Sequence, residues 1–256
     1  MLHDYIYVPI YNALLWLVQV LPGHDLGLAI ILITLAIRLI LYYPSLASIK
    51  SSRQLQNLQP RLKELQAQYK NDKEGLAREQ MKLYKESKVN PAASCLPLIV
   101  QLLIFFQLYQ VFLNGLKLTP EGFIQPDQLK DLMGGLRIYF EANPINATLF
   151  GWIDLSATKN IFLALLTGAT QFWQTKMLAA PKEPKTPEAR DEAMTSAVNR
   201  SMMYTLPLVM MWITYTLPAG LGLYWSVSSI FGVVQQYIFL HTHPMNKKTT
   251  PPATTA

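Results

Sequence analysis

The stretch Leu26–Pro44, LGLAIILITLAIRLILYYP, is apolar almost throughout and carries a single charged residue, Arg38. A helix of about 20 apolar residues can cross a hydrocarbon layer of roughly 30 Å, so this stretch predicts a membrane span. An arginine at the centre of a span costs about 2.5 to 3.5 kcal/mol on insertion scales. Water, a counter-charge or a polar groove between helices must therefore compensate for Arg38.

The composition of the whole chain favours a membrane protein. Of the 256 residues, 51% are hydrophobic and 15% are charged, and the hydrophobic residues gather in blocks. Cys95 is the only cysteine, which excludes a disulfide framework and a cysteine-based zinc site. The net charge of +6 does not indicate a nucleic acid site, because the basic residues lie between the apolar blocks.

Five apolar blocks predict an all-α polytopic membrane protein with five transmembrane helices. Several blocks are short for a span, so tilt or local thinning of the bilayer is expected. The last two meet at Leu217–Gly222 (LPAGLG), where a proline and two glycines predict a tight turn. The predicted spans are residues 26–50, 91–116, 159–178, 201–217 and 218–240.

Lysine and arginine are distributed unevenly between the segments that join these spans. Ten lie from Lys50 to Lys88, five from Lys176 to Arg200 and two in the tail, against four on the other side. By the positive-inside rule, the N-terminus lies outside and the C-terminus lies in the cytoplasm. Five spans satisfy this alternation of sides.

Residues 1–25 contain no lysine or arginine and predict an extracytoplasmic interfacial helix. Its aromatic residues Tyr5, Tyr7, Tyr11 and Trp16 suit the headgroup layer. The alternative is a first transmembrane helix that Pro22 cuts short. The other segments outside the spans are an extracytoplasmic loop at 117–158, with an interfacial Trp152 and no catalytic constellation, a flexible cytoplasmic loop at 179–200 and a disordered cytoplasmic tail at 241–256.

Residues 51–90 predict a cytoplasmic coiled-coil hairpin. Apolar residues recur three and four apart from Leu55 to Tyr69, turn residues around Gly75 interrupt the pattern, and a seven-residue spacing then resumes. The hairpin is either a solvated spacer or a docking arm for a cytoplasmic partner or an anionic lipid surface. The candidate docking residues are basic: Arg61, Lys63, Lys70, Lys73 and Arg78.

The sequence offers no pattern for catalysis, so we expect neither an enzyme nor a metal site nor a cofactor. The four histidines lie outside the predicted spans, and HExxH, Walker and GxGxxG motifs are absent. The other polar residues within the apolar cores of the spans are neutral, so Arg38 needs water or amide and hydroxyl partners. The economical arrangement is a hydrophilic groove around Arg38 that is closed towards the outside.

Three motifs resemble those of the YidC/Oxa1/Alb3 membrane protein insertases. The similarity runs in the expected order over nearly all the chain from Leu26 to His241. The motifs are Thr34–Pro44 (TLAIRLILYYP), Asn90–Gln101 (NPAASCLPLIVQ) and Leu217–Ser229 (LPAGLGLYWSVSS) with Gln235 and Gln236.

The resemblance implies an insertase and chaperone of new membrane proteins, in which Arg38 attracts acidic residues of the translocated segment. It implies nascent membrane proteins and membrane lipids as partners, with the ribosome and the Sec translocase as candidates. It implies a multi-pass location in the bacterial cytoplasmic (inner) membrane. The groove residues that it implies are Arg38, Thr34, Gln101, Gln171, Tyr224 and Trp225.

The chain also departs from larger members of that family. It shows no large periplasmic domain, no lipoprotein signal with its cysteine and no long basic tail, which predicts a short bacterial form. A small-solute transporter or anion channel that uses Arg38 as its binding charge is the alternative function. Such proteins usually contain internal repeats or interrupted helices in matching positions, and the sequence shows neither.

Overall fold

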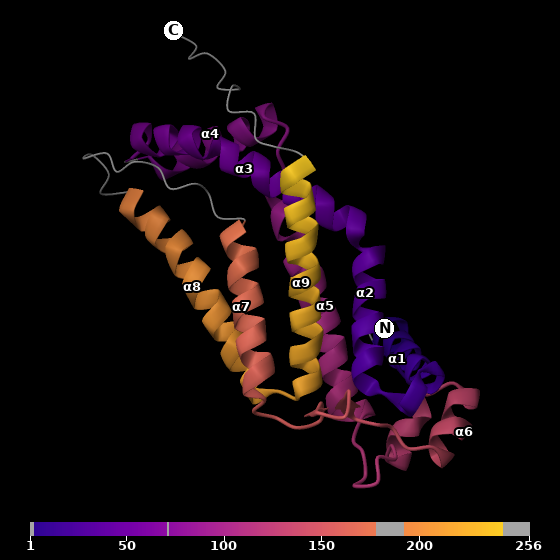
Figure 1. Ribbon diagram of the computed structural model, residues 1–256. Helices are drawn as coiled ribbons and strands as arrows, with labels where there is room; N and C mark the ends of the chain where they lie inside the picture. The colour runs from indigo at the N-terminus through magenta and orange to yellow at the C-terminus, as the bar shows by residue number, and fades with distance from the viewer. Residues whose placement is uncertain (1–2, 71, 178–191, 243–256) are drawn as a thin grey trace.

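The structure is a computed structural model that describes residues 3–70, 72–177 and 192–242. The predicted tail beyond residue 242 and most of the 179–200 loop lie outside the described residues. The chain is mostly helical, and the helices of its bundle run side by side along the molecule (Figure 1). They are α2 (Leu26–Ile40), α5 (Pro91–Gln110), α7 (Ile161–Met177), α8 (Glu192–Thr216) and α9 (Ala219–Thr242).

Helix α9 is the centre of this bundle, and α2, α5, α7 and α8 all contact it. Every residue from Ala219 to Ser226 is buried, so this part of α9 has no exposed face. Glycine permits the close approach of its neighbours. A Cβ atom on Gly220 would lie 2.1 Å from the ring of Phe112, and one on Gly222 would lie 2.5 Å from the methyl group of Thr214. The first half of α9 therefore forms the inner core.

The first predicted span bends instead of continuing straight to residue 50. Helix α2 ends at Ile40, α3 (Tyr42–Gln68) begins two residues later, and the two helices differ in direction by 64°. Pro44 lies in the first turn of α3, where a backbone N–H would have no partner within the helix. Proline, which lacks this N–H, is therefore tolerated there. The structure thus places the break at Leu41, and α3 runs without interruption from the bundle into the hairpin.

Helices α3 and α4 (Lys73–Glu86) contact each other and lie across one end of the bundle (Figure 1). Leu62 of α3 and Leu83 of α4, both members of the predicted apolar pattern, are buried. The carboxylate of Asp72 caps α4 by accepting a hydrogen bond from the N–H of Gly75 at 2.8 Å. The turn therefore forms where the sequence predicted it.

The N-terminal segment forms the π-helix η1 (His3–Tyr7) and α1 (Val8–Val20), which packs on α2. Tyr5 and Trp16 are exposed, but Tyr7 and Tyr11, which we expected at the headgroup layer, are buried. The hydroxyl of Tyr11 donates a hydrogen bond to the carbonyl of Gly115 at 2.7 Å. Burial, with a smaller contribution from the charge of Asp131, raises the pKa of Tyr7 to about 12. This phenol therefore remains uncharged at physiological pH.

The segment that we predicted as an outer loop is largely structured. The π-helix η3 (Val111–Gly115) follows α5 directly and precedes this segment. Within the segment lie the 3-10 helix η4 (Pro126–Asp131) and then α6 (Gly134–Ala142). Leu136 and Phe140 of α6 are buried. A β-hairpin of β1 (Thr148–Leu149) and β2 (Ile153–Asp154) completes the segment. The short lengths of these elements explain why the sequence pattern did not reveal them.

Asp25 joins this outer segment to the start of α2, after the short turn η2 (Pro22–His24). Its Oδ1 atom accepts a hydrogen bond from the N–H of Leu28 at 2.9 Å, and its Oδ2 atom accepts one from the N–H of Phe150 at 3.1 Å. One carboxylate therefore caps the helix and holds the hairpin.

We expect Asp25→Ala to lower the free energy of unfolding by about 1 to 2 kcal/mol, the usual cost of losing a helix cap. Asp25→Asn keeps one acceptor oxygen and should cost less. Thermal unfolding of the purified protein in detergent measures both, with the exposed Glu121→Ala as a control. Equal melting temperatures for Asp25→Ala and the parent protein would contradict this role.

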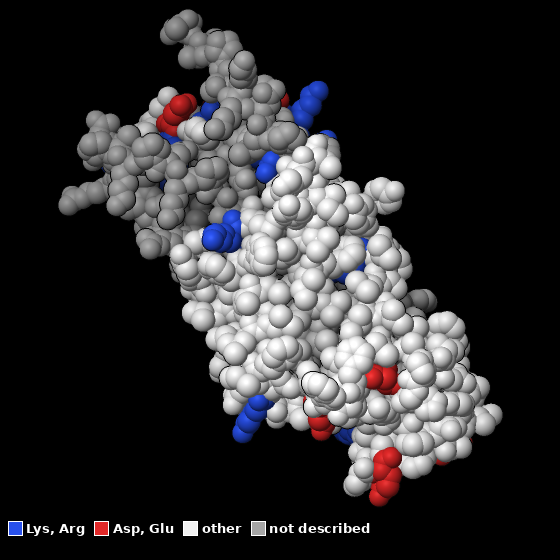
Figure 2. Space-filling model, viewed as in Figure 1, with Lys and Arg blue, Asp and Glu red and all other residues white. Residues whose placement is uncertain are grey.

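Charged side chains gather towards the two ends of the molecule, and most of the visible face between them is uncharged (Figure 2). Within the described ranges, none of the helices taken singly has both the length and the apolar composition to cross a membrane. The bent pair α2–α3 meets that condition when its two helices are taken together.

Candidate functional site

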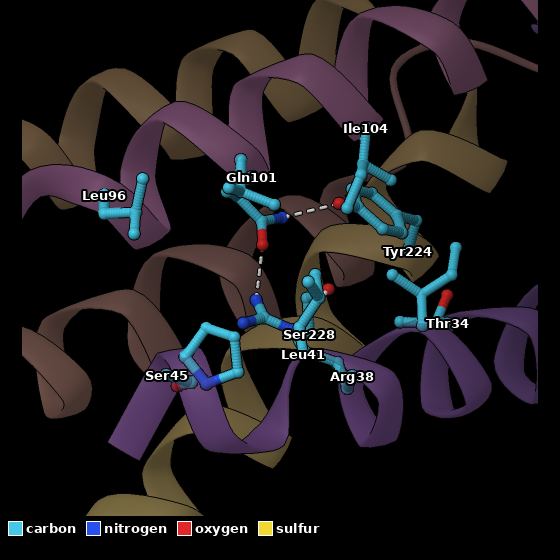
Figure 3. A pocket seen from close by; sticks show the side chains of 12 residues that line it. Thr34, Arg38, Leu41, Ser45, Leu96, Gln101, Ile104, Tyr224 and Ser228 are labelled. Atoms are coloured by element: carbon cyan, nitrogen blue, oxygen red, sulfur yellow. Dashed lines mark hydrogen bonds between the residues drawn. The ribbon is translucent and has the colours of Figure 1, made fainter. Parts of the chain in front are cut away.

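Arg38 lies in the last turn of α2 and points between α5 and α9 (Figure 3). Its Nε atom donates a hydrogen bond to the hydroxyl of Ser228 at 3.3 Å, and its Nη2 atom donates one to Oε1 of Gln101. In the part of the chain that the structure describes, no carboxylate pairs with this guanidinium. Neutral amide and hydroxyl groups are therefore its protein partners.

Gln101 connects Arg38 to Tyr224, as Figure 3 shows. Its amide oxygen accepts from the guanidinium, and its Nε2 atom donates to the hydroxyl of Tyr224 at 2.8 Å. An arginine can only donate, so the amide must turn its oxygen towards Arg38. This chain of hydrogen bonds fixes the orientation of three side chains from α2, α5 and α9.

Two adjoining hollows meet at Arg38, and we name them by their linings. The apolar hollow lies between α2, α5 and α9. The polar hollow extends towards α7 and α8. Arg38, Ser45 and Gln101 line both. The aliphatic residues of the apolar hollow are Ile37, Leu41, Leu96, Val100 and Ile104.

Serine and glutamine side chains line much of the polar hollow, beside the apolar residues Ile49, Leu206 and Met210 and the ring of Trp225. Arg38 is the only charged residue among the described residues that line it. Its net charge is therefore positive. The Oε1 atom of Gln236 is buried and has no hydrogen-bond donor within the described residues. An unsatisfied acceptor of this kind favours water in a polar cavity. The other polar residues of this lining are Ser48, Ser52, Gln171, Gln174, Ser229 and Gln235.

All six residues that we predicted for the groove line one or both hollows. Thr34 donates its hydroxyl to the carbonyl of Ile30 at 2.6 Å, so it forms a bond within its own helix. The indole N–H of Trp225 donates to Oε1 of Gln171 at 3.2 Å, and this bond joins α9 to α7. The structure thus brings the six together, while substrate binding by them remains a prediction.

Sequence reasoning missed Ser45 and Ser48, and it did not place Ser228 or Gln235 in the groove. The signal was present for two of them, because Ser228 follows Trp225 by one helical turn and Gln235 lies in the third motif. Ser45 and Ser48 follow Pro44, where we expected the straight end of a span. The bend at Leu41 turns them towards the polar hollow, whose lining includes both.

The five basic residues predicted for docking lie on the hairpin and line neither hollow. Lys70, Lys73 and Arg78 are exposed, whereas Arg61 and Lys63 are half-buried. These five basic residues therefore lie apart from the hollows, although Ser52 at the start of the hairpin lines the polar hollow.

Gln235 of α9 ties the bend between α2 and α3 to the centre of the bundle. Its Oε1 atom accepts a hydrogen bond from the hydroxyl of Ser45 at 2.7 Å, and its Nε2 atom donates one to the carbonyl of Tyr42 at 3.1 Å. The side chain is 3% exposed, so water cannot easily replace either bond.

We expect Gln235→Leu to destabilise the protein by about 1 to 3 kcal/mol, because it leaves buried polar groups unsatisfied. Gln236→Leu is the matched control, since Gln236 is also 3% exposed but its Oε1 atom already lacks a partner. The control should cost less. Thermal unfolding in detergent compares the two, and an equal loss in both variants would contradict the role of Gln235.

A family described as "60Kd inner membrane protein" matches residues 16–247, which is most of the chain. The chain belongs to this YidC/Oxa1 family. The resemblance that the three motifs suggested is therefore confirmed.

Curated relatives of this YidC/Oxa1 chain include "Membrane protein insertase YidC" from Francisella tularensis subsp. novicida (strain U112) and from subsp. tularensis (strain SCHU S4 / Schu 4). Each is 34% identical over 225 residues, which is 87% of this chain and 34% of the relative. The chain thus spans about one third of the length of these relatives. Their name describes insertion and not an enzymatic reaction.

A solved structure described as "Active YidC insertase crystal structure with the first transmembrane domain resolved" shares the fold of this YidC/Oxa1 chain. The TM-score is 0.56 at 24% sequence identity, and the match covers 94% of this chain and 47% of that one. The family description and this likeness together show a mostly helical protein of an inner membrane family.

Proposed function

We propose that this chain inserts newly made membrane proteins into the bacterial inner membrane and assists their folding. The observation that carries this proposal is the environment of Arg38, a cation inside the bundle whose partners are a neutral amide and a hydroxyl. The relatives named as insertases support it. Nascent membrane proteins and lipids are the partners that follow.

In the proposed arrangement, α2, α5, α7, α8 and α9 are the five transmembrane helices around the hydrophilic groove. The hairpin of α3 and α4 lies in the cytoplasm with residues 179–200 and the C-terminal tail. Residues 1–25 and 117–158 lie outside. The uncharged band between two charged ends and the excess of lysine and arginine in the hairpin support this orientation (Figure 2).

The guanidinium of Arg38 has N–H donors left for a further ligand in this site. A guanidinium has five N–H donors, and protein groups accept from Nε and Nη2. The remaining donors can bind a carboxylate of an incoming acidic segment through charge-assisted hydrogen bonds. Gln101, Gln171, Thr34 and the water of the polar hollow would solvate that segment, and Tyr224 and Trp225 would contact the emerging span.

Transfer of the apolar span into lipid drives the process. Burial of apolar surface releases about 25 cal/mol per Å², so a whole span supplies ample free energy. Nucleotide hydrolysis is not needed. The polar hollow only lowers the barrier for the short hydrophilic segment that must cross before the span can leave.

The hairpin is proposed to receive partners at the cytoplasmic surface. Three of its basic candidates, Lys70, Lys73 and Arg78, are exposed and can attract an anionic lipid surface or an acidic partner. The ribosome and the Sec translocase are candidate partners here. Binding of the purified chain to anionic vesicles and to ribosomes, before and after replacement of these three residues, compares the candidates.

Insertion and ion flux should be measured on the same vesicles reconstituted with the full chain. We expect a single-span substrate with an acidic outer tail to become protease-protected well above its level in protein-free vesicles, with no increase in chloride flux. Flux without insertion would overturn the proposal and favour the anion channel.

A photoreactive group at Trp225 tests the position of the substrate. We expect it to crosslink a stalled nascent chain, because Trp225 lines the polar hollow. The same group at Trp16, which is exposed on α1, is the control and should not crosslink. Equal crosslinking from both positions would contradict a substrate site in the hollow.

A further inference from the structure

The β1–β2 hairpin ends in three residues, Phe150-Gly151-Trp152, which we call the aromatic tip. Trp152 is 92% exposed and Phe150 is 64% exposed, whereas Leu149 of the stem and Leu155 directly after it are buried. The tip contains no charged residue. It therefore presents two aromatic side chains on a stem that is anchored in the core.

The backbone of the tip is unusual for an aromatic residue. Phe150 and Gly151 have φ angles of 51° and 74°, and the N–H of Trp152 donates to the carbonyl of Leu149 at 3.0 Å. Consecutive positive φ angles characterise type I′ turns, where Asn-Gly and Asp-Gly are the preferred pairs. A bulky side chain is strained at positive φ. Strain of this kind suggests that the aromatic side chain serves a purpose at this position.

The tip is fixed at the outer ends of the long helices. The N–H of Phe150 donates to Asp25, which also caps α2, and Leu149 packs so close to Gly27 that a Cβ atom there would lie 2.5 Å from it. Beyond the hairpin, the N–H of Ala219 at the start of α9 donates to the carbonyl of Ala157 at 2.9 Å. Thus the tip lies at the level where α2 and α9 begin.

We propose that the aromatic tip is a membrane anchor whose Phe150 and Trp152 enter the interfacial layer of the outer lipid leaflet. The inference rests on the proposed function, because it requires the outer ends of α2 and α9 to lie at the membrane surface. Tryptophan concentrates at that depth, since its ring is apolar and its N–H is polar. Phospholipid is the chemistry that fits an uncharged aromatic pair there.

A nitroxide at residue 152 measures its depth. The full chain with Cys95→Ala and Trp152→Cys is labelled and reconstituted in vesicles of phosphatidylethanolamine and phosphatidylglycerol. We expect frequent collisions with oxygen, which concentrates in lipid, and few with a water-soluble nickel chelate. A label at the exposed Glu121 of the same outer segment is the control and should show the opposite preference.

Phe150→Asn separates anchoring from a structural role. Asparagine tolerates positive φ, so the turn should persist and its strain should fall. Anchoring predicts that this change raises nickel collisions at residue 152 at least twofold, whereas a purely structural role predicts no change. Equal nickel access at residues 152 and 121 would overturn the anchor. Shielding from both nickel and oxygen would also overturn it, since this would indicate a protein contact.

The depth measurement is independent of insertion activity. An exposed label at residue 152 with normal insertion would remove the anchor alone. A lipid-embedded label with no insertion would leave the anchor in place and remove the proposed function.

Discussion

Replacing Arg38 with alanine is expected to slow insertion of substrates with acidic outer tails by about tenfold or more. Hydrogen bonds to charged groups contribute about 1.5 to 3 kcal/mol, and each 1.4 kcal/mol corresponds to a factor of ten. Substrates with neutral outer tails should lose much less, because they form no ion pair. Protease protection in reconstituted vesicles, with both substrate types side by side, measures the difference.

Arg38→Lys should lie between alanine and the parent protein. Lysine retains the charge but cannot bind Ser228, Gln101 and a carboxylate with one planar group. If Arg38→Ala inserts the acidic substrate at the parental rate, Arg38 has a structural role and the proposed attraction is wrong. Thermal unfolding of each variant must accompany the assay, so that loss of folding is not counted as loss of attraction.

Gln101→Glu is expected to impair the same acidic substrates about as strongly as Arg38→Ala. The new carboxylate would replace the amide oxygen that already accepts from Arg38. Two unit charges at about 4 Å attract by roughly 4 kcal/mol at an effective dielectric constant of 20, so the pair would be stable. The guanidinium would then be paired within the protein and less available to an incoming carboxylate, while the shape of the hollow changes little.

Gln171→Glu is the matched control for this substitution. Gln171 also lines the polar hollow, but its amide oxygen accepts from Trp225 and not from Arg38. Its effect on insertion should be smaller than that of Gln101→Glu. Full activity of Gln101→Glu would show that a free Arg38 guanidinium does not determine how fast acidic segments cross.

Much of the candidate site could be predicted from the sequence, because a single charged residue in an apolar stretch requires polar partners. The apolar cores of the predicted spans contain no acidic residue that could neutralise Arg38, so amides and hydroxyls were its expected partners. Gln101 then followed from the second motif. The helical fold class followed from the apolar blocks, and the family match and the solved structure support it.

The rest depends on three-dimensional relations that a sequence does not record. Ser228 lies 190 positions from Arg38, so their contact depends on how α9 is rotated against α2. At the bend at Leu41, the first turn of α3 is hydrogen-bonded to Gln235 of the distant helix α9. Tyr7 and Tyr11 suit an interface by composition, but the packing of α1 on α2 buries them.

The buried first half of α9 has a consequence for tolerance to mutation. A helix with one buried side shows sensitive positions every three or four residues. From Ala219 to Ser226 there is no such side, because all eight residues are enclosed. A saturation library scored for cell growth would therefore find an unbroken run of eight intolerant codons there, with the three-to-four-residue rhythm returning between Ser228 and Gln236, where buried and exposed residues alternate.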